Sequence, residues 1–472
     1  MSEAHFGKSL RATGSTLARM RCAGTRSLSV LVGAGAFALC SACDAPVAPN
    51  LLLIVVDTLR ADHTSPYGYA GDVTPRLAQL ADEGVQVEIA YAPTATTGPS
   101  HAALFTGRYP RSVGVLRNAV PLGRDYDTLA EHLAAAGWQT AAVVSSFPLH
   151  RRFGFSQGFG AYLDDFDPER ASVRHTDFEG HQVPEGFDRR ADDATDRALE
   201  WLATRNGRPE PFFLFVHYFD PHEPYAAPLS YQRRFAVGAD ASLREQAAAL
   251  YDAEVAFTDA EIGRLIDGLA AAGFGDDTYV VLTADHGEGL FQHGHLFHDV
   301  HLYEEAVRVP LLLRGPGLTR GTLLRGPVTL LDLFSTLLAL LGVEPSDAAL
   351  PGASFAALLR GEGGIEPERS LVLERREFTS GRVGDVPVKG ELLALRRGRW
   401  KYIEAPEEQR YELYDLRNDP RERNDLRETQ PAIAGELAAE LARWRAATPA
   451  AAAAGPVSPE DRKRLEALGY VD

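Results

Sequence analysis

Cysteine and positive charge are both scarce in this chain of 472 residues. Its three cysteines are Cys22, Cys40 and Cys43, so residues 44–472 contain no disulfide, no thiol nucleophile and no thiolate metal ligand. Lysine and arginine number 48 against 65 aspartates and glutamates, a net charge of −17. Binding nucleic acid without sequence preference needs clustered positive charge, and this composition argues against such a partner. Apolar residues make up 45% and charged residues 24%, which excludes a collagen-like or mostly disordered chain.

The N-terminal segment has the order of a secretory signal. Residues 1–26 carry five basic side chains and one acidic side chain, and residues 28–39 form an uncharged, mostly apolar stretch. That stretch is shorter than the roughly 20 residues that span a bilayer, and two small residues follow it before Cys43. We therefore expect an exported protein, either periplasmic or anchored to the membrane by a lipid on Cys43. A plain cleaved signal and a short uncleaved anchor are open alternatives, and Met20 is an alternative start.

After a signal over 1–43 and a short tether over 44–49, the sequence predicts an α/β fold. Asn50–Val56 is a continuous apolar run, typical of a strand buried on both faces of a parallel sheet. Further strands alternate with helices, which predicts a mainly parallel sheet flanked by helices. The expected units are a large domain over 50–345, a smaller α+β subdomain over 346–446, and an Ala/Pro linker with a charged tail over 447–472. Expected helices are Thr74–Gly84, Thr128–Gly137, Asp193–Thr204, Ala247–Ala272, Val328–Gly342 and Pro431–Ala446, and expected strands include Thr140–Ser145, Pro211–Tyr218, Thr278–Thr283, Val309–Leu313, Leu371–Glu374, Leu392–Leu395 and Trp400–Ile403.

Oxygen and nitrogen ligands gather at two expected strand ends. Asp57 follows Asn50–Val56 directly, and Asp285-His286 lies just past Thr278–Thr283. In open α/β sheets, ligands bind at the carboxyl ends of the strands. Five of the fourteen histidines fall between residues 286 and 301, a density that argues against isolated structural histidines. A mixed oxygen and nitrogen ligand set favours zinc or manganese over calcium, which prefers six to eight oxygens.

Two further segments offer polar groups for chemistry. Thr97 precedes Gly98-Pro99 at an expected helix start, where free N–H groups and the helix dipole favour a phosphoryl or sulfuryl group. The alternative is that Thr97 only caps the helix, and this segment alone does not decide between the two. The strand Pro211–Tyr218 leads into His222, which lies past the strand end and is a candidate for contacting a substrate, whereas His217 also fits a core histidine.

Several segments together resemble the sulfatase family, which belongs to the alkaline phosphatase superfamily. They are NLLLIVVDTLRADH, TPRLAQLADEGV, TGPSHAALFTGRYP, TADHGEG, VRVPLLLRGPG and ELYDLRNDPRERNDL. The resemblance extends from about residue 50 to 446 and implies a buried divalent metal at the carboxyl edge of the sheet. By similarity, Asp57, Asp285 and His286 match metal-ligand positions, and Thr97 matches the nucleophile.

Two histidines match family positions that contact the transferred group or the leaving group. These are His222 and His298, and His298 is the best candidate to protonate the leaving alkoxide. A second metal is a further possibility, with Asp220 and His222 as its ligands. Lys401 has two interpretations, a structural role, which we favour, and a contact to the substrate anion.

The chain also departs from the sulfatase pattern. The family has Cys or Ser, converted to formylglycine, followed by x-Pro-x-Arg, and here Thr97 and His101 stand at the nucleophile and the arginine positions. Thr58 also replaces a second carboxylate after Asp57. Formylglycine cannot be made from threonine, so the sequence favours hydrolysis of a phosphoric mono- or diester through an unmodified Thr97. A sulfuric ester hydrolase and an inactive relative that binds an anionic glycan or lipid are the alternatives, and the expected substrate is a small anionic ester, such as a lipid head group or a glycan.

Overall fold

The computed structural model describes residues 48–167, 187–383 and 386–452, all within one compact unit, Val47–Asp472. The predicted signal over 1–43 and most of the predicted tail lie outside these residues. Within the described residues, no helix combines the length and the apolar character that crossing a membrane requires. The division of the chain at residue 345 stays a prediction.

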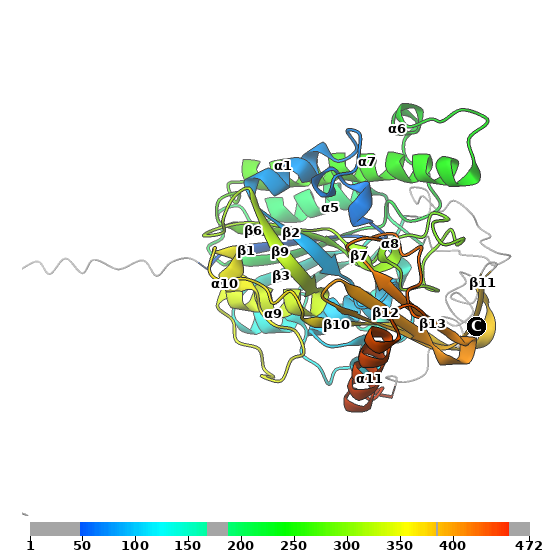
Figure 1. Ribbon diagram of the computed structural model, residues 1–472. Helices are drawn as coiled ribbons and strands as arrows, with labels where there is room; N and C mark the ends of the chain where they lie inside the picture. The colour runs from blue at the N-terminus through cyan, green and yellow to red at the C-terminus, as the bar shows by residue number, and fades with distance from the viewer. Residues whose placement is uncertain (1–47, 168–186, 384–385, 453–472) are drawn as a thin grey trace, which may run out of the picture. The chain divides into compact units, whose positions relative to one another are not determined.

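A nine-stranded sheet forms the centre of the fold, in the order β4-β3-β5-β1-β6-β8-β2-β7, with β9 pairing to β2 (Figure 1). Its β4, β3, β5, β1 and β6 run parallel, and β8 is antiparallel to both β6 and β2. The mixed, mainly parallel α/β sheet confirms the predicted fold class. The strands are β1 (Asn50–Val56), β2 (Val85–Tyr91), β3 (Gln139–Val143), β4 (Ala161–Leu163), β5 (Phe212–Tyr218), β6 (Thr278–Ala284), β7 (Arg308–Val309), β8 (Leu311–Arg314) and β9 (Thr322–Thr329).

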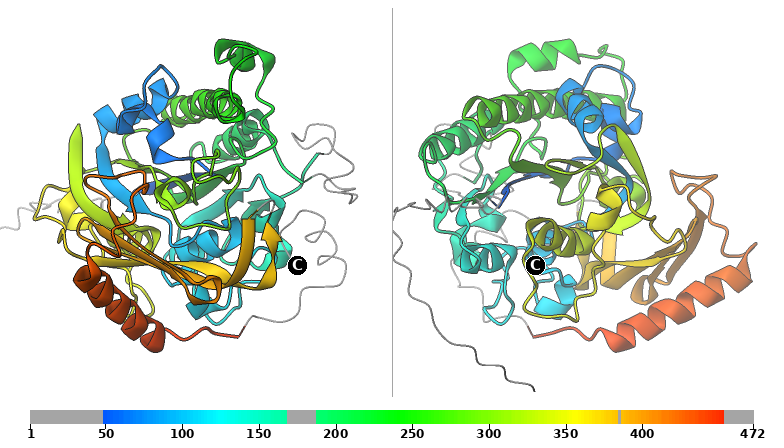
Figure 2. Two further views of the ribbon diagram at one scale, coloured as in Figure 1. Left: turned by 45° about the vertical axis from the view of Figure 1, so that its right-hand side comes forward. Right: turned by 90° about the vertical axis from the view of Figure 1, so that its left-hand side faces the viewer.

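Helices cover both faces of this sheet, which explains why β1, β5 and β6 are mostly apolar and buried along their whole length. On one face, α7 packs against α1, α5 and α6, as Figures 1 and 2 show. On the other face, α2 packs against α4 and α9. The helices named here are α1 (Pro75–Glu83), α2 (Thr97–Thr106), α4 (Leu129–Ala135), α5 (Ala191–Ala203), α6 (Leu229–Arg234), α7 (Leu243–Ala271) and α9 (Leu330–Leu341).

A second, antiparallel sheet of four strands follows, in the order β10-β11-β12-β13, with α11 packed on β11 and β12 (Figure 2). Successive side chains of a strand point to opposite faces. Val372, Leu393 and Leu395 accordingly pack with α11, whereas Leu371 and Leu392 pack with residues of the large sheet. The elements are β10 (Ser370–Val383), β11 (Val386–Arg397), β12 (Trp400–Ala405), β13 (Arg410–Asp415) and α11 (Pro431–Ala447).

Most predicted elements are present with shifted boundaries, and the strands expected over Leu371–Glu374 and Leu392–Leu395 are parts of the longer β10 and β11. The single strand expected over Val309–Leu313 is divided into β7 and β8, with Pro310 between them, and proline has no N–H to donate to a ladder. The helix expected from Val328 begins at Leu330, because Val328 and Thr329 end β9 and Thr329 caps α9. The strands β2, β4, β9 and β13 were missing from the prediction.

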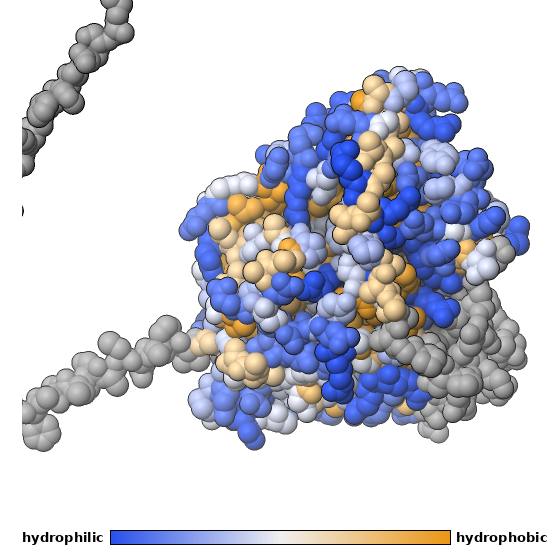
Figure 3. All heavy atoms as spheres, turned by 90° about the horizontal axis from the view of Figure 1, so that it is seen from below, coloured by the Kyte–Doolittle hydropathy of each residue, from blue (hydrophilic) through white to orange (hydrophobic). Residues whose placement is uncertain are grey.

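The surface seen from below in Figure 3 is mostly hydrophilic, with hydrophobic residues in small groups. Five large hydrophobic side chains are clearly exposed among the described residues, and three of them belong to α6 or α7. They are Leu229, Val237, Leu243, Leu250 and Leu323.

Candidate active site

Three neighbouring parallel strands converge on the candidate site. In the register of the sheet, Val55 of β1 lies beside His217 of β5, and Val56 lies beside Ala284 of β6. The residues that come next, Asp57 and Asp285, therefore lie together at the carboxyl edge with His217. All three are fully buried, so the polar edge predicted from the sequence is an enclosed centre rather than an exposed loop cluster.

The three predicted metal ligands form one tight group. His286 Nε2 lies 3.4 Å from Asp285 Oδ2 and 3.7 Å from Asp57 Oδ1. His286 Nδ1 lies 3.0 Å from the carbonyl of Gly287 and donates to it, which leaves Nε2 with its lone pair facing the two carboxylates. One ligand atom of each residue lies within 4.8 Å of the others. The structure therefore brings the three predicted residues together in a group that could hold a metal ion.

Unpaired oxygens show that this group fits a cation. Both carboxylate oxygens of Asp57 and Oδ2 of Asp285 are buried without a hydrogen-bond donor, which costs free energy unless a cation or donor compensates them. Burial raises the pKa of Asp57 to about 6. Burial and the charge of Asp57 also raise the pKa of Asp285. A divalent metal bound between these residues would relieve that repulsion.

An unusual backbone conformation next to Asp57 helps to hold the Asp285 carboxylate. Thr58 follows Asp57 with φ of +56°, in the left-handed region that a β-branched residue rarely adopts. In this conformation the Thr58 N–H donates to Asp285 Oδ1 at 3.2 Å, and the His286 N–H donates to the same oxygen at 2.8 Å. The two donors fix the Asp285 carboxylate and leave Oδ2 as its free ligand atom.

Thr97 lies in the same centre. It is the first residue of α2, and its Oγ1 lies 3.3 Å from His286 Nε2. The N-cap residue is Thr96, which makes no side-chain capping bond, so the interpretation of Thr97 as a simple helix cap is wrong. The N–H of Gly98 donates to Asn118 Oδ1 at 2.7 Å, so this N–H is not free for an anion as the sequence suggested.

His298 and His222 line the same centre. The ring of His298 lies between His286 and His222, with centroid distances of 4.5 and 5.0 Å. Burial opposes protonation of His298, but Glu288, whose Oε1 lies 3.3 Å from Nδ1, and Asp299 raise its pKa to about 10. Burial and the neighbouring His298 lower the pKa of His222 well below its ordinary value. The pair therefore combines a protonated and a neutral imidazole.

Two further histidines lie in this centre, although neither was predicted as a site residue. His101, noted only as a replacement for arginine, donates from Nδ1 to the Thr97 carbonyl at 2.8 Å and has an unpaired Nε2. His217, considered a core histidine, lies with Nε2 3.5 Å from Asp57 Oδ2. Together with Asp285 they form a second group of potential ligands within 4.8 Å. Burial lowers the pKa of His101 to about 3 and that of His217 to about 4, so both rings are neutral. The signal that could have indicated them is position, one helical turn after Thr97 and at the end of β5.

Other polar residues singled out in the sequence have structural roles. Asp220 accepts from the N–H of Ala191 at 2.6 Å and so holds the start of α5, and it belongs to neither ligand group among the described residues. Lys401 is fully buried, with Nζ 3.0 Å from Glu304 Oε1 and 2.9 Å from Glu422 Oε1. This agrees with the structural interpretation that the sequence favoured.

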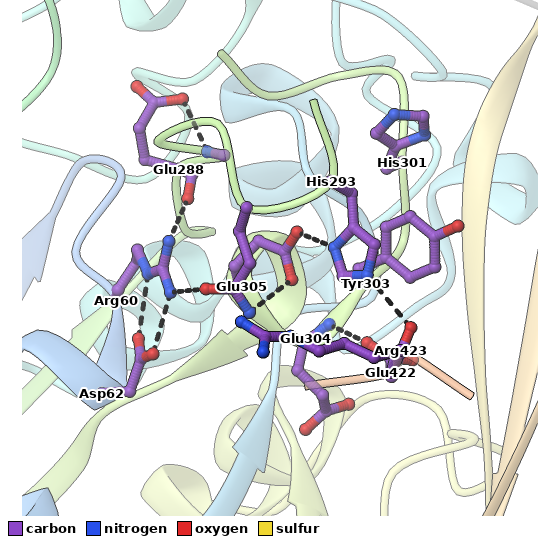
Figure 4. A network of polar contacts seen from close by, with 12 residues as sticks. Arg60, Asp62, Glu288, His293, His301, Tyr303, Glu304, Glu305, Glu422 and Arg423 are labelled. Atoms are coloured by element: carbon purple, nitrogen blue, oxygen red, sulfur yellow. Dashed lines mark hydrogen bonds and ion pairs between the residues drawn. The ribbon is translucent and has the colours of Figure 1, made fainter. Parts of the chain in front are cut away.

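A polar network anchors the histidine-rich loop behind the site (Figure 4). Arg60 donates from Nη1 to the Glu288 carbonyl at 3.0 Å and from Nη2 to Gln292 Oε1 at 2.9 Å. His293 pairs with Glu305 and stacks on Tyr303 with a centroid distance of 3.7 Å. This histidine therefore fixes the loop and does not join the ligand group.

The comparisons with known proteins agree with this architecture. The family model described as Sulfatase matches residues 49–343, and the model described as N-sulphoglucosamine sulphohydrolase, C-terminal, matches residues 292–447. The chain therefore belongs to the sulfatase family of ester hydrolases. It is 26% identical over 428 residues to the uncharacterized sulfatase YidJ of Escherichia coli (strain K12), covering 80% of this chain and 83% of that protein.

Two solved structures share the fold. The phosphonate monoester hydrolase of Agrobacterium radiobacter superposes with a TM-score of 0.69 at 23% identity, covering 85% of this chain and 96% of that one. BT4656, in complex with its substrate D-glucosamine-2-N,6-O-disulfate, also has a TM-score of 0.69, at 22% identity, covering 84% of this chain and 97% of that one. The same fold thus serves proteins whose substrates are phosphonate and sulfate esters.

Proposed function

We propose that this protein is a metal-dependent hydrolase of phosphoric mono- or diesters that uses Thr97 as its nucleophile. The observation that carries the proposal is the position of Thr97 Oγ1, 3.3 Å from His286 Nε2 and thus beside the Asp57, Asp285 and His286 group. The hydroxyl at this position cannot become formylglycine, and an unmodified hydroxyl suits phosphoryl transfer through a covalent intermediate.

The ligand set favours one divalent metal, zinc or manganese, held by Asp57, Asp285 and His286. Such an ion lowers the pKa of a hydroxyl and stabilises negative charge on a transferring group. The neutral His101 and His217 supply further nitrogen donors, and His217 Nε2 lies 3.5 Å from Asp57 Oδ2. If these nitrogens hold a second metal ion, elemental analysis should find more than one metal ion per chain.

The reaction follows from the positions of the side chains. Thr97 first releases its hydroxyl proton to solvent. Its Oγ1 then attacks the phosphorus as the alkoxide and forms a P–O bond as the bond to the leaving alkoxide breaks, and His298 donates its proton to that leaving alkoxide. Water then attacks the phosphothreonine, and the P–O bond to Thr97 breaks. The deprotonated His298 accepts the proton of the attacking water, which restores both residues. His222 borders the same space and positions the ester.

The experiment is a trapped intermediate. Purified protein reacts with a labelled aryl phosphate or bis-aryl phosphate, is quenched in acid, and is mapped by peptide mass spectrometry. We expect the phosphate on the peptide that contains Thr97. Thr97→Ala should lower kcat by several orders of magnitude and keep its metal, and Thr97→Ser should keep part of the activity. Thr106→Ala, in the same helix and equally buried, is the matched control and should keep normal turnover. Substantial turnover by Thr97→Ala, or a label on another peptide, refutes the mechanism.

A sulfuric ester hydrolase is the second candidate, because the family model and the C-terminal model are both those of sulfatases. The same variants assayed on an aryl sulfate separate the two: a higher kcat/KM for sulfate than for phosphate esters favours this candidate. No turnover of either ester with a fully loaded metal site would favour the inactive, anion-binding alternative.

We also propose that the protein is exported and that Cys43 is the first residue of the mature chain, with or without a lipid. The support is the order of basic, apolar and small residues before Cys43. Mass spectrometry of the native protein should find a chain that begins near Cys43, and a full-length cytoplasmic chain refutes this.

A further inference from the structure

A cavity separate from the catalytic centre lies where β2 and β9 approach the turn between β11 and β12. Its volume is about 790 Å³, within the range of pockets that hold small molecules. None of the catalytic or metal-ligating residues named above lines it. The cavity is basic, because five arginines line it against three glutamates. The arginines are Arg308, Arg325, Arg396, Arg399 and Arg417.

Arg396 carries the argument. It is only 6% exposed, and its Nε and Nη1 are buried without a hydrogen-bond partner. Its guanidinium lies 5.7 Å from the centre of the Tyr91 ring, which also lines the cavity. A buried guanidinium with unpaired N–H groups loses hydration that nothing in the protein replaces. Because Arg396 lines the cavity, an oxyanion there would lie beside this guanidinium and compensate its charge.

The other charged residues that line the cavity do not supply a hydrogen-bond partner for the unpaired N–H groups of Arg396. Glu304 is already engaged, since Tyr91 donates to both of its carboxylate oxygens, at 2.9 and 3.0 Å, and Lys401 pairs with one of them. Arg308 bonds the carbonyl oxygen of Glu88, at 3.1 Å, while its own Nε is unpaired. Arg399 pairs with Asp415 through Nη2, and its Nε is likewise unpaired. Glu88 and Glu368 are the remaining acids of the lining, so cationic groups exceed the available carboxylates.

We propose that this cavity is a second anion-binding site, which takes a sulfate or phosphate group through Arg308, Arg396 and Arg399. Its volume admits the sugar that carries such a group as well as the free anion. The site stands independently of the proposed catalytic function, because it shares no residue with the catalytic centre.

The first test locates the anion. Crystals of the full chain soaked in sodium selenate should show an anomalous peak within hydrogen-bond distance of Arg396, apart from any peak at the catalytic centre. A selenate peak at the catalytic centre alone overturns the proposal.

The second test measures binding by isothermal titration with sodium sulfate at constant ionic strength. Arg396→Gln should weaken binding at this site about tenfold, the loss of a charged partner to an oxyanion. Since Arg396 is buried and its variant can fold poorly, the double variant Arg399→Gln with Arg417→Gln, whose side chains are partly or fully exposed, should show the same loss. Arg233→Gln makes the same charge change on α6, at a residue that does not line the cavity, and should bind as the parent does. Equal affinities in all three variants and the parent overturn the proposal.

A third arm distinguishes the sources of the anion in the Thr97→Ala protein. Glucose 6-sulfate that binds at least tenfold more tightly than inorganic sulfate supports the anionic group of a sugar ligand, and equal affinities support the free anion. Glucose that binds as tightly as glucose 6-sulfate overturns an anion site altogether.

Discussion

Replacing Lys401 with methionine separates its two possible roles. Its ammonium group is fully buried and pairs with Glu304 and Glu422, from α8 (Glu304–Val307) and from the segment after β13. Methionine keeps a similar volume but leaves the Glu304 carboxylate without its cation. Removing one partner of a buried ion pair costs about 3–5 kcal/mol. Because Tyr91 still donates to Glu304 at 2.9 Å, we expect a loss at the lower end, about 3 kcal/mol in the free energy of unfolding.

Equilibrium urea unfolding measures this loss. With a slope of about 3 kcal/mol/M, the upper value for small proteins and a conservative one for this length, the midpoint should fall by about 1 M. The kcat/KM per folded molecule should stay unchanged. Lys389→Met is the matched control, since Lys389 is exposed on β11, and its midpoint should move little. A variant that unfolds like the parent but loses more than tenfold in kcat/KM would show that Lys401 acts on the substrate, and our reasoning would be wrong.

The remaining predictions concern the metal and pH. Elemental analysis of purified protein should find about one zinc or manganese per chain; Asp285→Ala should lose it, because it removes an unpaired ligand oxygen, and His132→Ala, distant from the ligand group, should keep it. Burial raises the pKa of Glu422 from 4.5 to about 8, so the folded state keeps a proton that the unfolded state has released. Stability should therefore fall as the pH rises from about 5 to 8, by at most about 1.4 kcal/mol per pH unit. Glu422→Gln should flatten that slope in urea titrations, and an equal slope in both proteins contradicts the assignment.

Much of the fold followed from the sequence because its strongest signals were periodic or continuous. The apolar run of β1 predicted Asn50–Val56 to the residue, since a short, nearly continuous apolar run is typical of a strand buried on both faces. The strands β2 and β9 were not predicted. They lie toward the sheet edge and mix buried with partly exposed side chains, so their sequences show neither a continuous apolar run nor a regular alternation.

The sequence predicted six residues of the candidate site, but it did not predict how the packing of α2 against β5 adds two more histidines to it. All six predicted residues meet at one centre, because carboxyl ends of parallel strands coincide. The contribution of His101 and His217 depends on packing between α2 and β5, which no local pattern encodes. The unpaired nitrogens of both rings were visible only once the helix lay against the sheet.

The left-handed backbone at Thr58 implies a trade between stability and function. A β-branched residue at φ of +56° carries a penalty of about 1–2 kcal/mol that glycine would not carry. The fold tolerates this penalty at Thr58, where the conformation directs the Thr58 N–H toward Asp285 Oδ1. The chain therefore holds the Asp285 carboxylate in place through a backbone conformation that lowers its own stability.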